Sequence, residues 1–266
     1  MSNSELDQLS LIAARAALKG GIEILEVYNN ETAQVQTKGD DSPLTQADTR
    51  AHQAIMKILE PTGIPVLSEE GKHLPFEERE NWSQLWIVDP LDGTKEFIKR
   101  NGEFTVNIAL VENGRPIMGV VYVPVTGELY LGSKGQGAVK LIIDSETELS
   151  SEHLSQGKSI PIKMKRQFTA VGSRSHMNEE TEDFLKTYRE EHGEVAILSK
   201  GSSLKMCMVA EGLADVYPRF APTMEWDTAA GQAVVEAAGF SMLEKESRLP
   251  LQYNKENLLN PHFIVL

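Results

Sequence analysis

The segment 86–97 most constrains how this chain can fold, because a short apolar run in it ends abruptly at two carboxylates. Residues 86–88 are typical of a buried strand, whereas Asp89 and Asp92 begin the turn signals Asp-Pro and Asp-Gly. The chain therefore leaves a core strand and presents two anionic oxygen donors at its end. Hard divalent cations such as Mg²⁺ favour these ligands. An ordinary turn is the alternative, since Asp, Pro and Gly are common in turns anyway.

Hydrophobic periodicity predicts a first part built from two amphipathic helices and an antiparallel meander. Apolar residues at helical spacing indicate helices over 6–28 and 45–60, the second with Thr45 as its N-cap and Asp48 in a capping-box position. Asn113, followed by glycine, is a hairpin signal between two alternating apolar runs. The expected strands are 65–67, 86–88, 104–111, 116–123, 128–131 and 137–143.

The second part alternates strands with helices, a pattern that predicts a layered α/β lobe. A polar, irregular stretch over 144–163 separates it from the first part. We therefore expect an α+β lobe over residues 1–150 and an α/β lobe over 151–266. The expected elements of the second lobe are strands 167–172, 195–199, 214–218, 240–243 and 262–266, and helices 178–192, 202–211 and 227–238.

Charge and cysteine content narrow the functional classes. The 39 acidic residues outnumber the 26 basic ones and give a net charge of −13, which argues against non-specific binding to nucleic acid. The single cysteine, Cys207, excludes an internal disulfide, and its apolar neighbours predict a small buried side chain. We find no signal-peptide pattern and no apolar run that could span a bilayer, so a cytoplasmic location is expected.

Acidic residues follow three predicted apolar segments. Glu69 follows one strand, Asp89 and Asp92 follow another, and Asp227 lies at a predicted helix start. Singly, each has a simpler explanation: Glu69 as a solvated residue, Asp227 as an acid at the positive end of a helix dipole. If the four converge, they form a cluster that stays ionised only with cations. Two or three Mg²⁺ ions are natural partners for such a cluster, and they suit phosphoryl chemistry.

Three segments of the second part carry groups that an anionic substrate needs. Residues 172–176 place hydroxyls, a cation and an imidazole after a strand, and Gly201 to Lys205 form a small-residue loop before a helix. Backbone N–H groups in such a loop suit a phosphate, although Gly-Ser-Ser also caps helices without any ligand. Arg219 lies between aromatic residues, which favours packing over a pocket; a surface position is the alternative.

These segments together resemble the Mg²⁺-dependent, lithium-sensitive phosphatases related to inositol monophosphatase. The shared signatures are Ser68-Glu69-Glu70, Asp89-Pro-Leu-Asp-Gly-Thr94 and Trp226-Asp227-Thr-Ala-Ala-Gly231, within a resemblance that covers nearly the whole chain. The similarity is greatest to the bacterial 3′(2′),5′-bisphosphate nucleotidases of that superfamily, as residues 95–97 and the three second-part segments indicate. The resemblance implies a layered αβαβα sandwich.

The resemblance also implies a ligand set for two to three Mg²⁺ ions. Glu69, Asp89 and the backbone carbonyl of Leu91 are expected to bind the first ion. Asp89 is expected to bridge to a second ion held by Asp92 and Asp227. A third, weaker ion would rest on Glu69 and water. Carboxylates and a carbonyl are the hard oxygen ligands that Mg²⁺ prefers.

Catalytic and substrate-binding roles follow from the same resemblance. Asp48 and Thr94 are expected to orient and deprotonate the attacking water beside Glu69. Lys205 and Arg219 are the candidates for a 5′-phosphate. The other expected substrate contacts are Gly93, Thr94, Ser173, His176, Gly201, Ser202 and Asp227.

The implied activity is removal of the 3′-phosphate of adenosine 3′,5′-bisphosphate, and of its 5′-phosphosulfate analogue as a second substrate. An inositol or sugar monophosphatase with the same metal core is the alternative enzyme, and a sensor that binds metal and nucleotide without turnover is the alternative of another class. The expected partner is a small nucleotide and no nucleic acid. Oligomeric state and a peripheral contact with the inner face of the inner membrane stay open.

Overall fold

A mixed seven-stranded sheet organises the first part of the chain. The computed structural model describes residues 1–30, 43–72, 74–144, 147–172 and 179–266. The strands lie in sequence order, with β1 parallel to β2 and the other neighbours antiparallel. They are β1 (Val66–Ser68), β2 (Gln84–Asp92), β3 (Thr105–Glu112), β4 (Arg115–Val123), β5 (Glu128–Ser133), β6 (Gly137–Ile142) and β7 (Lys158–Ile160). The expected meander is confirmed.

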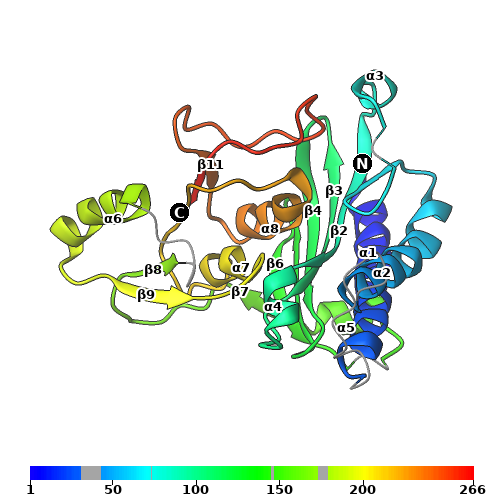
Figure 1. The fold of residues 1–266 in the computed structure, drawn as a ribbon, viewed down its shortest axis with the longest axis horizontal. Coiled ribbons are helices and arrows are strands. Elements are labelled where there is room, and N and C mark those ends of the chain that lie inside the picture. The colour runs from blue at the N-terminus through cyan, green and yellow to red at the C-terminus, as the bar shows by residue number, and fades with distance from the viewer. Residues whose placement is uncertain (31–42, 73, 145–146, 173–178) are drawn as a thin grey trace.

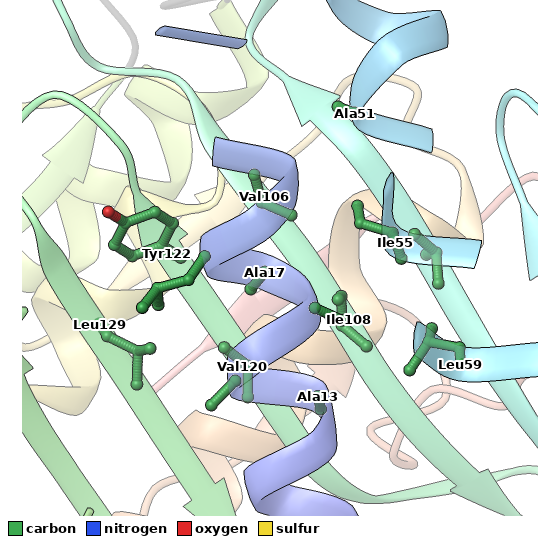
Figure 2. Close-up of a cluster of buried hydrophobic side chains, with 14 of the residues drawn as sticks. Ala13, Ala17, Ala51, Ile55, Leu59, Val106, Ile108, Val120, Tyr122 and Leu129 are labelled. Carbon is green, nitrogen blue, oxygen red and sulfur yellow. The ribbon is translucent and has the colours of Figure 1, made fainter. Parts of the chain in front are cut away.

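Helices α1 (Asn3–Tyr28) and α2 (Pro43–Leu59) cover one face of this sheet (Figure 1). The sheet-facing side of α1 carries small residues, and Figure 2 shows Ala13 and Ala17 between α1 and the strands that bear Ile108 and Val120. All four of these side chains are fully buried. Small helix residues facing larger strand residues let the two layers interdigitate at the density of a protein interior.

The opposite face of the sheet carries α7 (Leu204–Ala210) and α8 (Glu225–Ala237). Helix α8 lies very close to β4 at Gly119, where an added Cβ would sit 2.4 Å from the carbonyl oxygen of Ala230. Only glycine permits this approach, because any side chain would overlap the helix backbone. The N-terminus of α8, with Asp227 in its first turn, is thereby fixed against the central sheet.

A second sheet and a last helix complete the layers. Strands β8 (Thr169–Gly172) and β9 (Ala196–Ser199) are parallel, and β10 (Tyr217–Arg219), β12 (Phe263–Val265) and β11 (Met242–Glu244) are antiparallel in that order. A bridge between Ala170 and Val216 links the two groups. Helix α6 (Glu179–His192) lies at the end of the molecule opposite α1 and α2 (Figure 1). Three apolar clusters separate the layers, so the αβαβα sandwich is confirmed.

Two expectations about local structure were wrong. Helix α2 begins by Pro43, so Thr45 lies inside its first turn instead of capping it, and Asp48 is not a capping-box residue. Proline suits the first turn of a helix because its fixed φ is helical and its missing N–H has no helical partner there. The described residues of the stretch 144–163 are not all irregular, because they include α5 (Ser151–Ser155) and β7.

Strand β7 pairs with β6 and extends the first sheet to residue 160. The division into lobes near residue 150 stays a prediction. The sequence pattern did not predict three short helices: η2 (Glu60–Thr62), α3 (Phe76–Arg79) and α4 (Thr94–Ile98). Cys207 is fully buried, as expected. In the described ranges we find no helix with the length and apolar character needed to traverse a bilayer.

Candidate active site

A β-bulge in β2 brings Asp89 and Asp92 to the same face of the sheet. Residues three apart on a regular strand point to opposite faces. Here Asp89 pairs with Asn107 of β3, whereas Asp92 pairs with Thr105, which is only two residues away from Asn107. The extra residue in β2 restores a common side for the two carboxylates. Within the bulge, the Leu91 N–H donates to Asp89 Oδ1 at 3.0 Å.

Glu69, Asp89 and Asp227 form a compact carboxylate cluster, with one oxygen from each lying within 4.8 Å of the others. Parallel pairing explains the first two positions: Ser68 of β1 is paired with Val88 of β2, so the residues that follow lie side by side. Asp227 arrives from the first turn of α8, where its Oδ2 accepts the Met224 N–H at 2.8 Å. The structure therefore brings together three acids that are up to 158 residues apart in sequence.

The carboxylates of this cluster resist ionisation in the metal-free protein. Burial is the main cause of a pKa well above the usual range at Asp89, and the charges of Asp92, Glu69 and Asp227 add to it. Burial and then Asp92 raise the pKa of Asp227 to about 7. The pKa of Glu69 is also raised, by burial, by Glu70 and by Asp92. Clustered acids of this kind require a cation to stay ionised at neutral pH.

Asp48 lies beside the cluster on α2. Burial raises its pKa to about 8, and the negative charges of Glu70 and Glu69 contribute. Its Oδ1 atom is buried and has no hydrogen-bond partner among the described residues. A buried carboxylate oxygen without a partner is costly in the absence of water or an ion. This atom, together with the three-acid cluster, fits a hydrated divalent cation with oxygen ligands.

A cavity of about 340 Å³ opens next to the carboxylates. Asp92 and Asp227 line it, whereas Glu69, Asp89 and Asp48 do not. The other predicted substrate residues that line it are Gly93, Thr94, Gly201, Ser202, Lys205 and Arg219. Two further predictions, Ser173 and His176, lie outside the described residues. The lining thus combines acids with cations. We call Asp92, Asp227 and the adjoining carboxylate cluster the acidic end, and Lys205 with Arg219 the cationic wall.

Lys205 and Arg219 supply the cationic wall. The Lys205 side chain, in the first turn of α7, is almost completely buried. Burial lowers its pKa to about 8, with Asp92 opposing this shift and the cation of Arg219 adding to it. Arg219 Nε is buried and has no hydrogen-bond partner among the described residues. Two neighbouring cations, one of them short of partners, form a site suited to an oxyanion.

The loop before α7 is held close to the first part of the chain. A Cβ on Gly201 would lie 2.4 Å from Glu96 Cγ and 2.8 Å from the carbonyl oxygen of Glu103, so glycine is needed there. Glu103 accepts the Gly201 N–H at 3.0 Å and contacts Lys200 Nζ at 3.3 Å. Next in the loop, Ser202 has a φ of +44° and a buried hydroxyl with no partner among the described residues.

Sequence analysis missed three polar residues that support this site: Asn107, Glu103 and Ser203. Ser203 donates from its N–H to Asp92 Oδ2 at 2.6 Å. Asn107 is buried and donates to the Ser203 hydroxyl at 2.9 Å. The only sequence signal for Asn107 is a polar residue inside an otherwise apolar strand, which usually indicates a buried hydrogen-bond partner.

Comparison with known proteins now identifies the family. The model of the inositol monophosphatase family matches residues 5–262. The 3′(2′),5′-bisphosphate nucleotidase CysQ of Escherichia coli (strain K12) is 45% identical over 265 residues, which cover 98% of each chain. The CysQ protein of Haemophilus influenzae is 32% identical and covers 98% of this chain and 92% of its own length.

Solved structures agree with this assignment. The crystal structure of CysQ from Bacteroides thetaiotaomicron, a bacterial member of the inositol monophosphatase family, is 51% identical, with a TM-score of 0.94 over 99% of this chain and 98% of its own. An inositol monophosphatase from Zymomonas mobilis is 25% identical, with a TM-score of 0.74 over 100% and 94% of the two chains. This chain therefore belongs to the metal-dependent inositol monophosphatase family.

Proposed function

We propose that the chain is a Mg²⁺-dependent 3′(2′),5′-bisphosphate nucleotidase that converts adenosine 3′,5′-bisphosphate to adenosine 5′-monophosphate and phosphate. The observation that carries this proposal is the cavity with carboxylates at one end and the Lys205–Arg219 pair on its wall. A substrate with two phosphates fits such a site, because one group needs cation-assisted hydrolysis and the other needs binding only. The CysQ relatives, similar over nearly their whole length, support the same activity.

The residues that would hold two to three Mg²⁺ ions are Glu69, Asp89, Asp92, Asp227 and the backbone carbonyl of Leu91. When bound, the metal supplies charge neutralisation for the phosphoryl group and activates water for attack. Asp89 is central, because its carboxylate is almost completely buried and the charges of Asp92, Glu69 and Asp227 all act on it. A bulge and a parallel strand pair fix the acids before any ion arrives, so little reorganisation is needed.

Asp48 and Thr94 are the residues we assign to the attacking water. Asp48 Oδ1, which has no hydrogen-bond partner in the described part of the chain, would accept the proton, and Thr94 lines the cavity at the start of α4. Burial and the charges of Glu70 and Glu69 raise the pKa of Asp48 to about 8, which supports a role as proton acceptor. A general base works best when its pKa lies near the working pH. Positive charge bound nearby would lower the pKa of Asp48 toward that range.

The opposite end of the nucleotide lies, in this proposal, against the second lobe. Arg219 can bind a 5′-phosphate through two N–H groups, and Lys205 can add a buried positive charge. An anion beside Lys205 would offset the burial that lowers its pKa. Gly201 and Ser202, whose buried hydroxyl has no hydrogen-bond partner among the described residues, would contact sugar and base. The same wall would accept the 5′-phosphosulfate analogue. The cytoplasmic location expected from the sequence stays a prediction.

Phosphate release tests the proposal directly. We expect kcat/KM with Mg²⁺ to be at least about tenfold higher for adenosine 3′,5′-bisphosphate than for inositol 1-phosphate, because only the first substrate uses the Lys205–Arg219 wall. A preference for inositol phosphate would favour the monophosphatase alternative. Tight binding of nucleotide with no phosphate release from any substrate would favour the sensor alternative. Removal of metal by a chelator should abolish turnover in the proposed enzyme.

A further inference from the structure

Ser203 lies between the end of β2 and the start of α8 and contacts both of the aspartates that line the cavity. It is 1% exposed. Its N–H and its hydroxyl both reach Asp92 Oδ2, at 2.6 and 2.7 Å, and the hydroxyl lies 2.8 Å from the backbone carbonyl oxygen of Asp227. A single residue of the nucleotide-side loop therefore connects the end of β2 with the start of α8.

The buried polar groups around Ser203 fix the direction of its hydroxyl. Thr105 donates to Asn107 Oδ1 at 3.1 Å, which leaves the Asn107 amide to donate to Ser203 Oγ at 2.9 Å. A hydroxyl has one proton. Ser203 therefore accepts from Asn107 and donates its own proton to Asp92 Oδ2, the closer and the charged one of its two acceptors. Thr105, Asn107 and Ser203 are all almost completely buried, so a missing partner would be costly.

The position of the hydroxyl is not explained by the helix that follows. Ser203 is the N-cap of α7, a place where serine normally accepts a backbone N–H of the first turn. Here its side chain makes no capping hydrogen bond. The hydroxyl points instead across the lobe junction to Asp92. The Ser203 hydroxyl therefore bonds to the Asp92 carboxylate instead of to a backbone N–H of α7.

The hydrogen-bond donors around Asp92 gather at one of its two carboxylate oxygens. Its Oδ2 accepts from Ser203 twice, and Asn107 and Thr105 lie within 3.4 and 3.5 Å of the same oxygen. Across the described residues, the hydrogen bonds that Asp92 accepts all fall on Oδ2. The protein thus satisfies one oxygen of this carboxylate and leaves the other for a different ligand. Partners behind a metal ligand that fix its orientation typically contribute 10- to 100-fold to metal affinity.

We propose that Ser203 is a positioning residue that orients the Asp92 carboxylate for metal binding and links the nucleotide-side loop to the metal centre. This inference rests on the proposed function, since it assumes that Asp92 is a metal ligand. It assigns Ser203 and Ser202, two adjacent serines of one loop, to different tasks. Ser203 acts on the metal side through Asp92, and Ser202 faces the substrate.

Metal titration without substrate tests this assignment. The free Mn²⁺ signal in electron paramagnetic resonance gives the dissociation constant of the metal-free full chain for Mn²⁺ as a probe. We expect Ser203→Ala to weaken the affected site by about 10- to 100-fold, because Asp92 loses the hydroxyl donor and the Asn107 amide keeps only its longer 3.4 Å contact with Asp92. Ser202→Ala is the matched control: it removes the same atoms one residue away and should leave the Mn²⁺ constant unchanged.

A second variant guards against a folding defect in Ser203→Ala, and near-ultraviolet circular dichroism of each metal-free variant checks the fold. Thr105→Val keeps the side-chain shape but frees the Asn107 amide to turn, so it should weaken Mn²⁺ binding by about three- to tenfold. Wild-type affinity in both folded variants would overturn the role of Ser203. Equal weakening by Ser202→Ala would also overturn it. If the wild-type chain hydrolyses the bisphosphate, either result rejects this inference alone; an inactive wild type that binds no Mn²⁺ rejects the proposed function.

Discussion

The acidic end and the cationic wall of the cavity are built in different ways. Glu69 and Asp89 directly follow paired residues of β1 and β2, so backbone hydrogen bonds of the central sheet fix their separation. Lys205 and Arg219 come from a helix start and a three-residue strand in the second part of the chain. Strand pairing therefore fixes two acids of the cluster, which Asp227 joins from α8, whereas Lys205 follows a loop that Glu103 attaches to the first part of the chain.

This difference separates reaction chemistry from substrate choice. Sheet register tolerates little change, because a slip of one residue would turn each carboxylate to the other face. Loops between elements tolerate substitution more readily and commonly carry specificity. We infer that the acidic end carries out the hydrolysis of a phosphate ester. The loop and its cations then determine which phosphorylated substrate is bound. The predictions below test each side of this division.

The largest effect is expected at the acidic end. Asp89→Asn should lower kcat/KM by more than about 100-fold for the bisphosphate and for any other phosphate substrate alike, because a ligand matters more than its supporting partners. Phosphate release from two substrates measures this. Asp183→Asn, an exposed acid on α6 paired with Lys186, is the control and should change neither rate. A substrate-dependent loss in Asp89→Asn would contradict the division.

At the cationic wall the effect should depend on the substrate. Arg219→Ala is expected to lower kcat/KM for adenosine 3′,5′-bisphosphate by about tenfold or more, since hydrogen bonds to charged groups contribute about 1.5 to 3 kcal/mol. The loss for adenosine 3′-monophosphate, which lacks the 5′-phosphate, should be within about twofold. Arg189→Ala, on the exposed side of α6, serves as the control. Equal losses on both substrates would remove Arg219 from the 5′-phosphate site.

The same division explains how much of the site could be predicted from the sequence. Asp89 and Asp92 are close in sequence and follow an apolar run, so the sequence alone could predict two carboxylates at the end of a buried strand. The bulge that gives them a common face was not, because it depends on pairing with β3. Ser203 was missed for a similar reason: its hydroxyl contacts an aspartate 111 residues earlier in the chain. Contacts of that kind leave no local pattern.

The fold shows the same limit. Long elements with strong periodicity, such as α1 and the meander from β3 to β6, lie close to their predicted positions. The short strand β7, Lys-Ser-Ile, has too few apolar residues to show alternation and is formed by pairing with β6. Thr45 was mistaken for a cap because threonine is a frequent cap, whereas Pro43 already lies in the helix.

A smaller effect concerns the stability of the metal-free protein. Asp48 has a pKa of about 8 in the folded chain against 3.8 for an unperturbed aspartate, so between these values the folded state holds more protons than the unfolded state. The free energy of unfolding therefore falls as the pH rises, and the contribution of Asp48 is complete below its unfolded pKa and lost above its folded one. Urea unfolding with chelator should show a loss of more than about 1 kcal/mol between about pH 5 and about pH 9.

Asp48→Asn is the direct check on that loss, because asparagine cannot ionise. Its unfolding free energy should fall less steeply over the same pH range than that of the wild type. Saturating Mg²⁺ should also flatten the wild-type curve, since a cation stabilises the ionised cluster. Identical slopes of unfolding free energy against pH in the variant and the wild type would show that Asp48 does not carry the pH dependence. They would contradict a raised pKa of Asp48 in the folded, metal-free chain.

The smallest effect is expected where the loop is attached to the sheet. Glu103→Gln keeps an oxygen to accept the Gly201 N–H but loses the charge that contacts Lys200. A partly exposed ion pair contributes about 0 to 1 kcal/mol, so KM for the bisphosphate should rise by less than about fivefold with kcat unchanged. Glu103→Ala also removes the acceptor for Gly201 and should raise KM further, because the loop that carries Ser202 and Lys205 is then released. A fall in kcat without a change in KM would instead place Glu103 with the acidic end, since only that end should act on the chemical step.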